Sequence, residues 1–335
     1  MNILLLSIAI VGGLGLIFSV GLSIASIYLT IKTDLRYEKM LSVLASANCG
    51  ACGYPGCSGY AKAILQGADF NLCTPGGQKT LDAISELLGK KAEAKAKEVA
   101  RVNCNGTEAN CEQRLIYDGL QTCRATTLMT DSTKKCLYGC EGYGDCVVSC
   151  MFDAIHMGPG RIPIVDEEKC TACGKCVKSC PKHLITIQPF ETRTYIACSN
   201  PDKGKAVTSV CKAGCIACEL CVKKCPKGAL VMKNGIPVWD QGKCDNLGVC
   251  AAVCPTGAIQ DLRKQIPKAF ISPDECTGKG ECSKVCPIRN CITGEPGKKH
   301  TVNPELCCGC KLCAPVCPSK AISMSEEKKT KRKTA

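Results

Sequence analysis

Four cysteines and a proline occupy twelve residues in the segment CTACGKCVKSCP, which runs from Cys170 to Pro181. The spacing of Cys170, Cys173, Cys176 and Cys180 fits C-x2-C-x2-C-x3-C-P, in which three thiolates hold one iron–sulfur cubane and the fourth holds a neighbouring cluster. Related groups recur along the chain and predict serial clusters. They begin at Cys49, Cys136, Cys170, Cys215, Cys244, Cys276 and Cys307.

Zinc is the alternative metal, because paired C-x2-C motifs can form a zinc ribbon. Zinc ribbons separate two pairs by a long loop, whereas this chain repeats a triplet followed by Cys-Pro, which favours clusters. A disulfide framework is disfavoured, because the 33 cysteines are odd in number and the chain of 335 residues is too long for a small secreted domain. We therefore expect reduced thiols that bind metal in a reducing cytosol.

The fourth cysteine of each run crosses to the neighbouring cluster, and this rule predicts how the groups pair. The group at Cys136 departs from the run, because its gaps are wider and Met151 replaces the proline. Four sets then contain four thiolates. They are Cys136, Cys140, Cys146 with Cys180; Cys170, Cys173, Cys176 with Cys150; Cys215, Cys218, Cys221 with Cys254; and Cys307, Cys310, Cys313 with Cys286.

Two further sets contain only three thiolates, because Leu247 and Lys279 stand where the second cysteine belongs. A three-iron cluster, or a four-iron cluster completed by another ligand, would satisfy either site. The last module resembles seven-iron ferredoxins, in which an extra cysteine corresponds to Cys291, and this favours three irons there. The two sets are Cys244, Cys250 with Cys225, and Cys276, Cys282 with Cys317.

A different pattern, CGACGYPGC, contains Cys49, Cys52 and Cys57, and a fourth thiol follows at Cys73. Its glycines and Pro55 allow a tight loop whose backbone amides can hydrogen-bond cluster sulfur. This set predicts one more four-iron cluster and brings the expected total to about seven. The remaining cysteines are expected to be structural or spare thiols. They are Cys104, Cys111, Cys123, Cys198, Cys211, Cys291 and Cys308.

The N-terminal segment from Met1 to Ile31 has no charged side chain and is long enough to span a bilayer as a helix. A cleaved signal peptide is disfavoured, because the apolar run is too long and lacks a basic start. Lys32, Arg36 and Lys39 follow the span, so the positive-inside tendency places the rest of the chain in the cytoplasm. The sequence predicts a single-pass protein of the inner (cytoplasmic) membrane.

These ligands must be positioned by small elements, because only 4% of the residues are aromatic and bound clusters must supply part of the interior. We predict an α+β fold in which ligand loops alternate with short helices and hairpins, and a helix from Thr80, as N-cap, to Val102. The predicted parts are a transmembrane anchor (1–31), a four-cysteine [4Fe-4S] domain (32–79), a helical linker and connecting segment (80–135), three tandem bacterial-type 2[4Fe-4S] ferredoxin-like modules (136–197, 198–262 and 263–324) and a basic tail (325–335).

Other chemistry is not indicated by the sequence. No G-x-G-x-x-G or G-x-x-x-x-G-K-[ST] motif occurs, so there is no signal for a nicotinamide, flavin or nucleotide pocket. The net charge of +13 includes the run from Lys328 to Lys333, which is typical of a solvated tail, and no motif for nucleic-acid binding accompanies it. We expect a carrier of electrons without an active site for an organic substrate.

The order of these features resembles the B subunit of the Rnf complex over essentially the whole chain. The resemblance rests on the apolar anchor, the C-x2-C-x4-C-x15-C group, YDGLQTC, GCEGYGDC, CSNPDKGKAVTSVCKAGCIACELC and the serial ferredoxin motifs. It implies an ion-translocating ferredoxin:NAD oxidoreductase (Na+ or H+), in which this chain accepts electrons from reduced ferredoxin and relays them to other membrane and peripheral subunits. In that family the distal modules would accept the electron, and the cluster of Cys49 to Cys73 would pass it on.

Two alternatives remain open. A polyferredoxin subunit of another membrane oxidoreductase, such as a hydrogenase or heterodisulfide reductase, would share the ferredoxin repeats but not the anchor followed by the Cys49 group. A structural or storage metal-binding protein would share the cysteines but would show no reversible redox chemistry.

Overall fold

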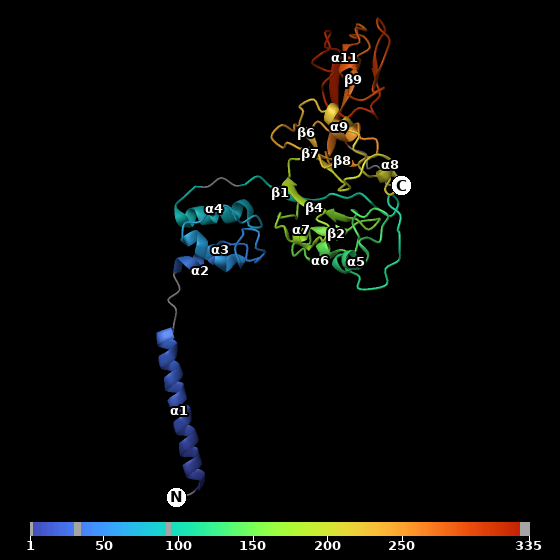
Figure 1. Ribbon diagram of the computed structural model, residues 1–335. Helices are drawn as coiled ribbons and strands as arrows, with labels where there is room; N and C mark the ends of the chain where they lie inside the picture. Colours follow the sequence, from blue (N-terminus) through green and yellow to red (C-terminus); the bar gives the residue numbers. More distant parts are fainter. Residues whose placement is uncertain (1–2, 30–34, 92–94, 329–335) are drawn as a thin grey trace. The chain divides into compact units, whose positions relative to one another are not determined.

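The computed structural model describes residues 3–29, 35–91 and 95–328, and the chain divides into two units, Met1–Ala94 and Lys95–Ala335 (Figure 1). Helix α1 (Ile3–Leu29) contains the apolar stretch Leu6–Leu29, whose mean hydropathy is 2.3 and whose side chains are not buried against protein. Its 24 residues are enough to cross a bilayer. The prediction of an apolar N-terminal helix is confirmed.

The rest of the first unit is a small helical domain of α2 (Leu35–Val43), α3 (Gly56–Leu65) and α4 (Gly77–Leu88). These helices are short and amphipathic, and they bury one apolar cluster that excludes water from the cysteine loop between α2 and α3. The buried residues of this cluster are Met40, Leu44, Tyr60, Ala61, Ile64 and Ile84.

The predicted helix from Thr80 to Val102 is wrong at both ends. Helix α4 begins before Thr80, whose hydroxyl donates to the Val43 carbonyl at 3.2 Å, and it ends at Gly89, whose φ of 63° is left-handed. Residues Glu98–Val102 form strand β1 instead. Residues 80–135, predicted as one linker, therefore contribute to helix α4 of the first unit and contain strand β1 of the second.

The second unit is built from two-stranded antiparallel sheets, six of them among the residues described. Three sheets each join the first and last strands of a module, and the other three are hairpins between two cysteine motifs. The outer pairs are β1 (Glu98–Val102) with β4 (Ile185–Pro189), β5 (Thr194–Ile196) with β8 (Ile259–Asp261), and β9 (Gln265–Ile271) with β12 (Ile322–Lys328). The hairpins are β2 (Ile155–Met157) with β3 (Pro163–Val165), β6 (Leu230–Lys233) with β7 (Ile236–Trp239), and β10 (Ile292–Thr293) with β11 (Thr301–Val302).

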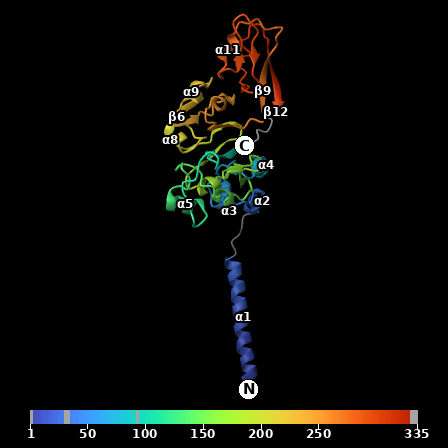
Figure 2. The ribbon, with the colours of Figure 1, turned by 90° about the vertical axis from the view of Figure 1, so that its right-hand side faces the viewer.

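The outer sheets extend beyond the predicted module limits. Strand β1 begins 38 residues before Cys136, β5 lies before residue 198, and β12 pairs with β9 as far as Lys328, inside the segment predicted as a tail. Figure 2 shows β9 and β12 side by side. The remainder of that tail lies outside the described residues.

Short helices follow five of the ligand loops and carry the cysteine at the third position of the motif. A residue with left-handed φ precedes each one, and it turns the chain so that the helix begins beside the loop. These helices are α6 (Asp145–Val148), α7 (Lys175–Ser179), α9 (Leu220–Lys223), α10 (Val249–Ala252) and α11 (Glu281–Val285).

Two insertions stand apart from this repeated plan. One joins β1 to Cys136 and contains α5 (Cys123–Thr130), and the other follows β5 and contains α8 (Lys205–Thr208). Lys212 N–H donates to the Asn110 carbonyl at 2.8 Å, and the Ser199 hydroxyl donates to the Asn103 carbonyl at 3.0 Å. The two insertions are therefore bonded to each other.

Candidate iron–sulfur cluster sites

The first module brings together one complete predicted set. Burial, together with the nearby thiols of Cys170, Cys173 and Cys150, raises the pKa of Cys176 to about 11. Such a site opposes free thiolates, and bound iron would compensate for their charge as it displaces the protons. The fourth thiol, Cys150, comes from the preceding motif, as the crossing rule predicts.

In the second module, a cavity of about 330 Å³ is lined by the predicted set Cys215, Cys218, Cys221 and Cys254. The neighbouring set of three is also assembled. Burial, together with the nearby thiols of Cys244 and Cys225, raises the pKa of Cys250 to about 11.

In the third module, a second cavity of about 330 Å³ is lined by the predicted set Cys286, Cys307, Cys310 and Cys313. Cys291 and Cys308 line the same cavity and are surplus to four ligands. At the set of three, burial raises the pKa of Cys282, and the thiols of Cys317 and Cys276 act in the same direction.

The Cys49 group is assembled in the first unit. Burial raises the pKa of Cys73, and the Cys57 and Cys49 thiols act in the same direction. The Tyr60 hydroxyl donates to the Asp69 carbonyl at 2.9 Å and accepts from Leu72 N–H at 3.0 Å, which fixes the loop that leads to Cys73. The structure thus brings Cys49, Cys57 and Cys73 close to one another, and Cys57 lies in the first turn of α3.

Backbone N–H groups point at the sulfurs of the motif cysteines. Such bonds favour the thiolate, and they tune the potential of a bound cluster. The donor and acceptor pairs are Ala100 to Cys170, Ala154 to Cys150 and Leu184 to Cys180, all at 3.4 Å, Ala229 to Cys225 at 3.3 Å, His300 to Cys276 at 3.4 Å and Ala269 to Cys307 at 3.5 Å.

The group at Cys136 differs from the arrangement predicted by its spacing. A cavity of about 320 Å³ is lined by Cys140, Cys146, Cys180 and Cys123, and Cys136 is not among its lining residues. Burial raises the pKa of Cys146 to about 12, and the Cys123 and Cys180 thiols act in the same direction. Cys123, predicted as a structural thiol, takes the place expected for Cys136. The wide gaps between cysteines in the Cys136 motif, and Met151 in place of proline, were the sequence features that indicated this difference.

Asp145 holds Cys123 in this place. Its carboxylate accepts the N–H groups of Cys123 at 2.9 Å and Arg124 at 3.1 Å, at the start of α5. The Thr122 hydroxyl accepts from Ala125 N–H at 3.1 Å and caps the same helix. Because Asp145 precedes Cys146, one carboxylate ties the two cysteines together.

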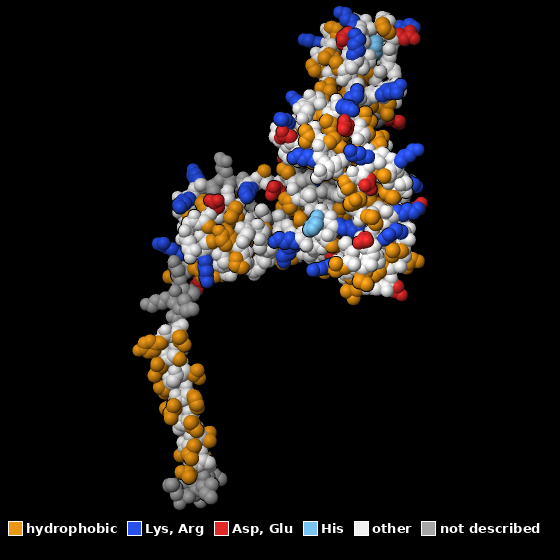
Figure 3. Space-filling model, in the orientation of Figure 1, with side chains coloured by type: hydrophobic (Ala, Val, Ile, Leu, Met, Phe, Trp, Pro, Cys, Tyr) orange, Lys and Arg blue, Asp and Glu red, His pale blue; other side chains and the backbone are white. Residues whose placement is uncertain are grey.

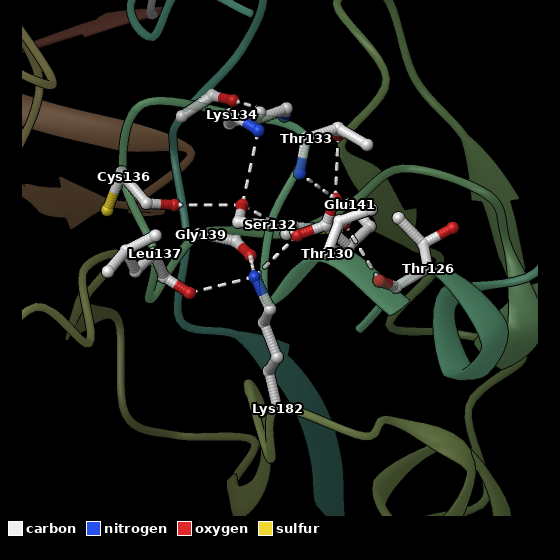
Figure 4. Close-up of polar contacts among 12 residues, drawn as sticks. Thr126, Thr130, Ser132, Thr133, Lys134, Cys136, Leu137, Gly139, Glu141 and Lys182 are labelled. Carbon is white, nitrogen blue, oxygen red and sulfur yellow. Dashed lines mark hydrogen bonds and ion pairs between the residues drawn. The ribbon is translucent and has the colours of Figure 1, made fainter. Parts of the chain in front are cut away.

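A buried ion pair supports the loop that carries Cys136 and Cys140. Glu141, only 1% exposed, pairs with Lys182 and also accepts from Ser132 Oγ at 2.8 Å and Thr133 Oγ1 at 2.7 Å (Figure 4). Lys182 also donates to the carbonyls of Leu137 at 2.8 Å and Gly139 at 3.1 Å. Burial opposes the charged form of Glu141, but the bonds from Lys182, Thr133 and Ser132 outweigh it and hold the carboxyl pKa below its usual value.

The donor geometry fits clusters better than single ions. Within residues 3–29, 35–91 and 95–328, no three His, Cys, Asp or Glu side chains converge closely enough for one metal ion. Thiolates lie about 2.3 Å from a zinc ion and would crowd together. Here four or more cysteines instead line each of the three cavities described above. The residues therefore fit iron–sulfur clusters, while the individual ligand sets stay predictions.

The surface carries positive charge in keeping with the net value of +13. Figure 3 shows Lys and Arg side chains distributed over the second unit, whereas apolar side chains cover α1. Most ion pairs that these lysines form are exposed, as with Lys97 and Glu168 at 3.2 Å or Lys169 and Asp153 at 3.3 Å. Such pairs leave the positive excess available to an acidic partner.

Comparisons with family models agree with this chemistry. A model for an Fe-S cluster family matches residues 44–75. A 4Fe-4S dicluster domain model matches residues 169–229 and 214–258, and a 4Fe-4S binding domain model matches residues 300–323. The prediction that the chain binds iron–sulfur clusters in ferredoxin-type domains is confirmed at this level.

Curated relatives match over most of the chain, and each is named as the B subunit of its complex. That of the Na(+)-translocating ferredoxin:NAD(+) oxidoreductase complex of Acetobacterium woodii is 40% identical over 77% of this chain and 78% of its own length. That of the ion-translocating oxidoreductase complex of Methanosarcina acetivorans is 39% identical over 77% of this chain and 98% of its length. That of the proton-translocating ferredoxin:NAD(+) oxidoreductase complex of Clostridium ljungdahlii is 35% identical over 78% and 94%.

A chain in the solved formate dehydrogenase, heterodisulfide reductase and formylmethanofuran dehydrogenase complex of Methanospirillum hungatei was also found. It is 22% identical, the match covers 58% of this chain and 79% of that chain, and the TM-score is 0.26.

Proposed function

The chain belongs to the family of B subunits of ion-translocating ferredoxin:NAD(+) oxidoreductase complexes, and from this premise we propose that it is the iron–sulfur electron-transfer subunit of such a complex. Bound clusters supply one-electron transfer. The protein's part is to hold them in series and to tune their potentials. No organic substrate is converted in this chain.

The observation that carries the proposal is the succession of cysteine-lined cavities through the modules, with motif cysteines that cross between neighbouring sites. Crossing ligands keep two sites of a module close, because a cysteine in a short helix and the next cysteine just after that helix serve different sites. The N–H groups directed at the sulfurs stabilise negative charge at each site and so help set its potential.

The clusters are [4Fe-4S] at the sets with four thiolates and [3Fe-4S] or a completed [4Fe-4S] at the two sets of three. The chain works with other subunits of its complex at the membrane. Helix α1 anchors it in the inner membrane, and the positive-inside tendency of Lys32, Arg36 and Lys39 supports a cytoplasmic location for the rest.

Reduced ferredoxin is the electron donor in this proposal. The positive surface would steer an acidic ferredoxin toward the modules and raise the rate of encounter. The Cys49 group follows the anchor in sequence and is the natural point of transfer to membrane subunits.

The test is anaerobic purification of the complex through a tag on this chain. Reduced ferredoxin is expected to reduce the clusters of this subunit and to support NAD reduction, with a rate constant for cluster reduction that falls as salt rises. Co-purification with hydrogenase or heterodisulfide reductase subunits, without ferredoxin-dependent NAD reduction, would contradict the proposal.

A further inference from the structure

Five cysteines outside the sets already described surround another cavity, at the junction of the two insertions. Its volume is about 350 Å³, close to the 320 to 330 Å³ of the motif sites. The cysteines that line it are Cys104, Cys111, Cys136, Cys198 and Cys211. We propose that this cavity binds an additional [4Fe-4S] cluster through Cys104, Cys136, Cys198 and one thiol of the pair Cys111 and Cys211.

The arrangement of the sulfurs supports four corners. Burial, together with the nearby thiols of Cys111, Cys104 and Cys198, raises the pKa of Cys136 to about 11, so these three sulfurs lie close to Cys136. Cys111 and Cys211 are hydrogen-bonded to each other and therefore occupy one corner. Cys111, Cys136 and Cys211 also form a buried cluster with Ala213, which excludes water.

The cysteines of this cavity share the bonding pattern of the motif ligands. Cys104 Sγ accepts from Gly106 N–H and Cys140 N–H, both at 3.4 Å, and Cys198 Sγ accepts from Cys215 N–H at 3.2 Å. The motif sulfurs accept backbone N–H groups at 3.3 to 3.5 Å. Thiols with an ordinary structural role would not need donors arranged for thiolates.

A buried cation lines the same cavity. Lys134 is only 2% exposed, and its ammonium donates to the Gly106 carbonyl at 2.7 Å. The carbonyl oxygen accepts a hydrogen bond from the ammonium but does not neutralise its charge. Burial of an uncompensated charge is strongly unfavourable, because the charge loses its hydration. A cluster with four thiolates carries net negative charge and would provide that compensation.

The site lies between the clusters of two modules. Cys140, whose N–H bonds Cys104 Sγ, lines the site of Cys123, while Cys215, whose N–H bonds Cys198 Sγ, lines the first cavity of the second module. On each side, a single hydrogen bond thus connects a sulfur of this site to a cysteine that lines the neighbouring site. Its use as a relay between the modules rests on the proposed function, whereas binding of the cluster does not.

The test measures iron and acid-labile sulfide in the anaerobically purified full chain and its variants. The double variant Cys104→Ser/Cys198→Ser is expected to lose about four irons and four sulfides per chain relative to the unchanged protein. Cys111→Ser/Cys211→Ser is expected to lose the same amount. Cys308→Ser, a buried thiol beside a site with four other ligands, is the matched control and keeps all its iron.

Spin quantitation by electron paramagnetic resonance of the reduced variants provides a second readout, because the signals of the other clusters must persist if the variants are folded. Unchanged iron in both double variants would overturn the proposal. A disulfide between Cys111 and Cys211 in the oxygen-free protein would also overturn it, because the fourth corner would then lack a thiolate. Failure of reduced ferredoxin to reduce the clusters of the unchanged protein, with the iron of this site present, would count against the proposed function but leave this site intact.

Discussion

Cys123 reaches its site because a single carboxylate, that of Asp145, accepts two N–H groups at the start of α5. The free N–H groups of a helix N-terminus attract negative charge, so Asp145 satisfies them while it stands beside Cys146. Cys136, only four residues before Cys140, contributes to a different cavity. At the scale of residues, separation along the chain is therefore a poor guide to shared ligation in this module.

Additivity of iron loss distinguishes the two arrangements. Cys123→Ser and Cys136→Ser are each expected to lose about four irons per chain, and the double variant about eight, because the two thiols serve separate clusters. Iron and sulfide analysis checks this. If Cys136 shared the site of Cys140, Cys146 and Cys180, the double variant would lose no more iron than Cys136→Ser alone.

Glu141→Gln is expected to lower the free energy of unfolding by about 3 to 5 kcal/mol, because Lys182 would remain buried without its partner. The folded-state pKa of Glu141 is lowered, so its contribution is present above the unfolded pKa of about 4.3 and is lost as pH falls through the folded value. Anaerobic denaturation at several pH values is the measurement, and the difference between the proteins should shrink below about pH 4.

The control is Glu112→Gln, which removes an exposed pair with Lys135. Its expected effect on the free energy of unfolding is small, because the pair is exposed and screened by solvent. Equal destabilisation by both variants would show that burial of the Glu141 pair is not the cause.

Much of the ligand chemistry could be predicted from spacing alone, because C-x2-C-x2-C-x3-C places its thiols locally. The thiols of Cys170, Cys173, Cys176 and Cys150 meet in the structure as that spacing predicts. Cys104 and Cys198 could not be assigned in this way, since they are 94 residues apart and are brought together by pairing of two insertions. Contacts between residues so far apart in the sequence depend on tertiary packing, and a local sequence pattern does not reveal them.

The elements of this chain are short because the loops, not the helices, gather the ligands. Residues 98–102 illustrate the limit of local prediction, because they continue a run of good helix formers. They form β1 instead, since pairing with β4 buries Val99 and Val102, and Arg101 gains an ion pair with Glu167. Tertiary pairing overrides a helix preference of a few tenths of a kcal/mol per residue.

Gly174→Ala is expected to lower the free energy of unfolding by about 1 to 2 kcal/mol, because φ is 75° at this position and an added Cβ strains the left-handed backbone. No atom lies within 4 Å of that Cβ, so steric contact does not contribute. Gly242→Ala is the matched control without positive φ, and it should be neutral or slightly stabilising. Denaturation midpoints check both, and equal shifts would contradict the explanation.

At the scale of the whole molecule, the apolar helix α1 and the two cysteine-bearing regions have different roles. The helix buries nothing within the chain, so its apolar side chains are available to lipid, while the cavities of the modules are independent of it. Attachment and electron transfer are therefore separable properties.

A variant that lacks residues 2–31 is expected to appear in the soluble fraction and to retain its iron, because no ligand precedes Cys49. Ultracentrifugation with iron analysis is the measurement. A variant that lacks residues 329–335 is the control and should stay with the membrane. Sedimentation of the first variant with membranes would mean that other subunits, not α1, hold the chain there.

The crossing of motif cysteines has a consequence for biogenesis. Cys146 lines one predicted cluster site while Cys150, four residues later, lies with the thiols of the other, and Cys176 and Cys180 do the same in reverse. Neither motif contains all the ligands of one predicted site, so we expect the two clusters of the module to be assembled together. Oxidation of the cysteines in one of these loops is therefore expected to impair both cluster sites of the module.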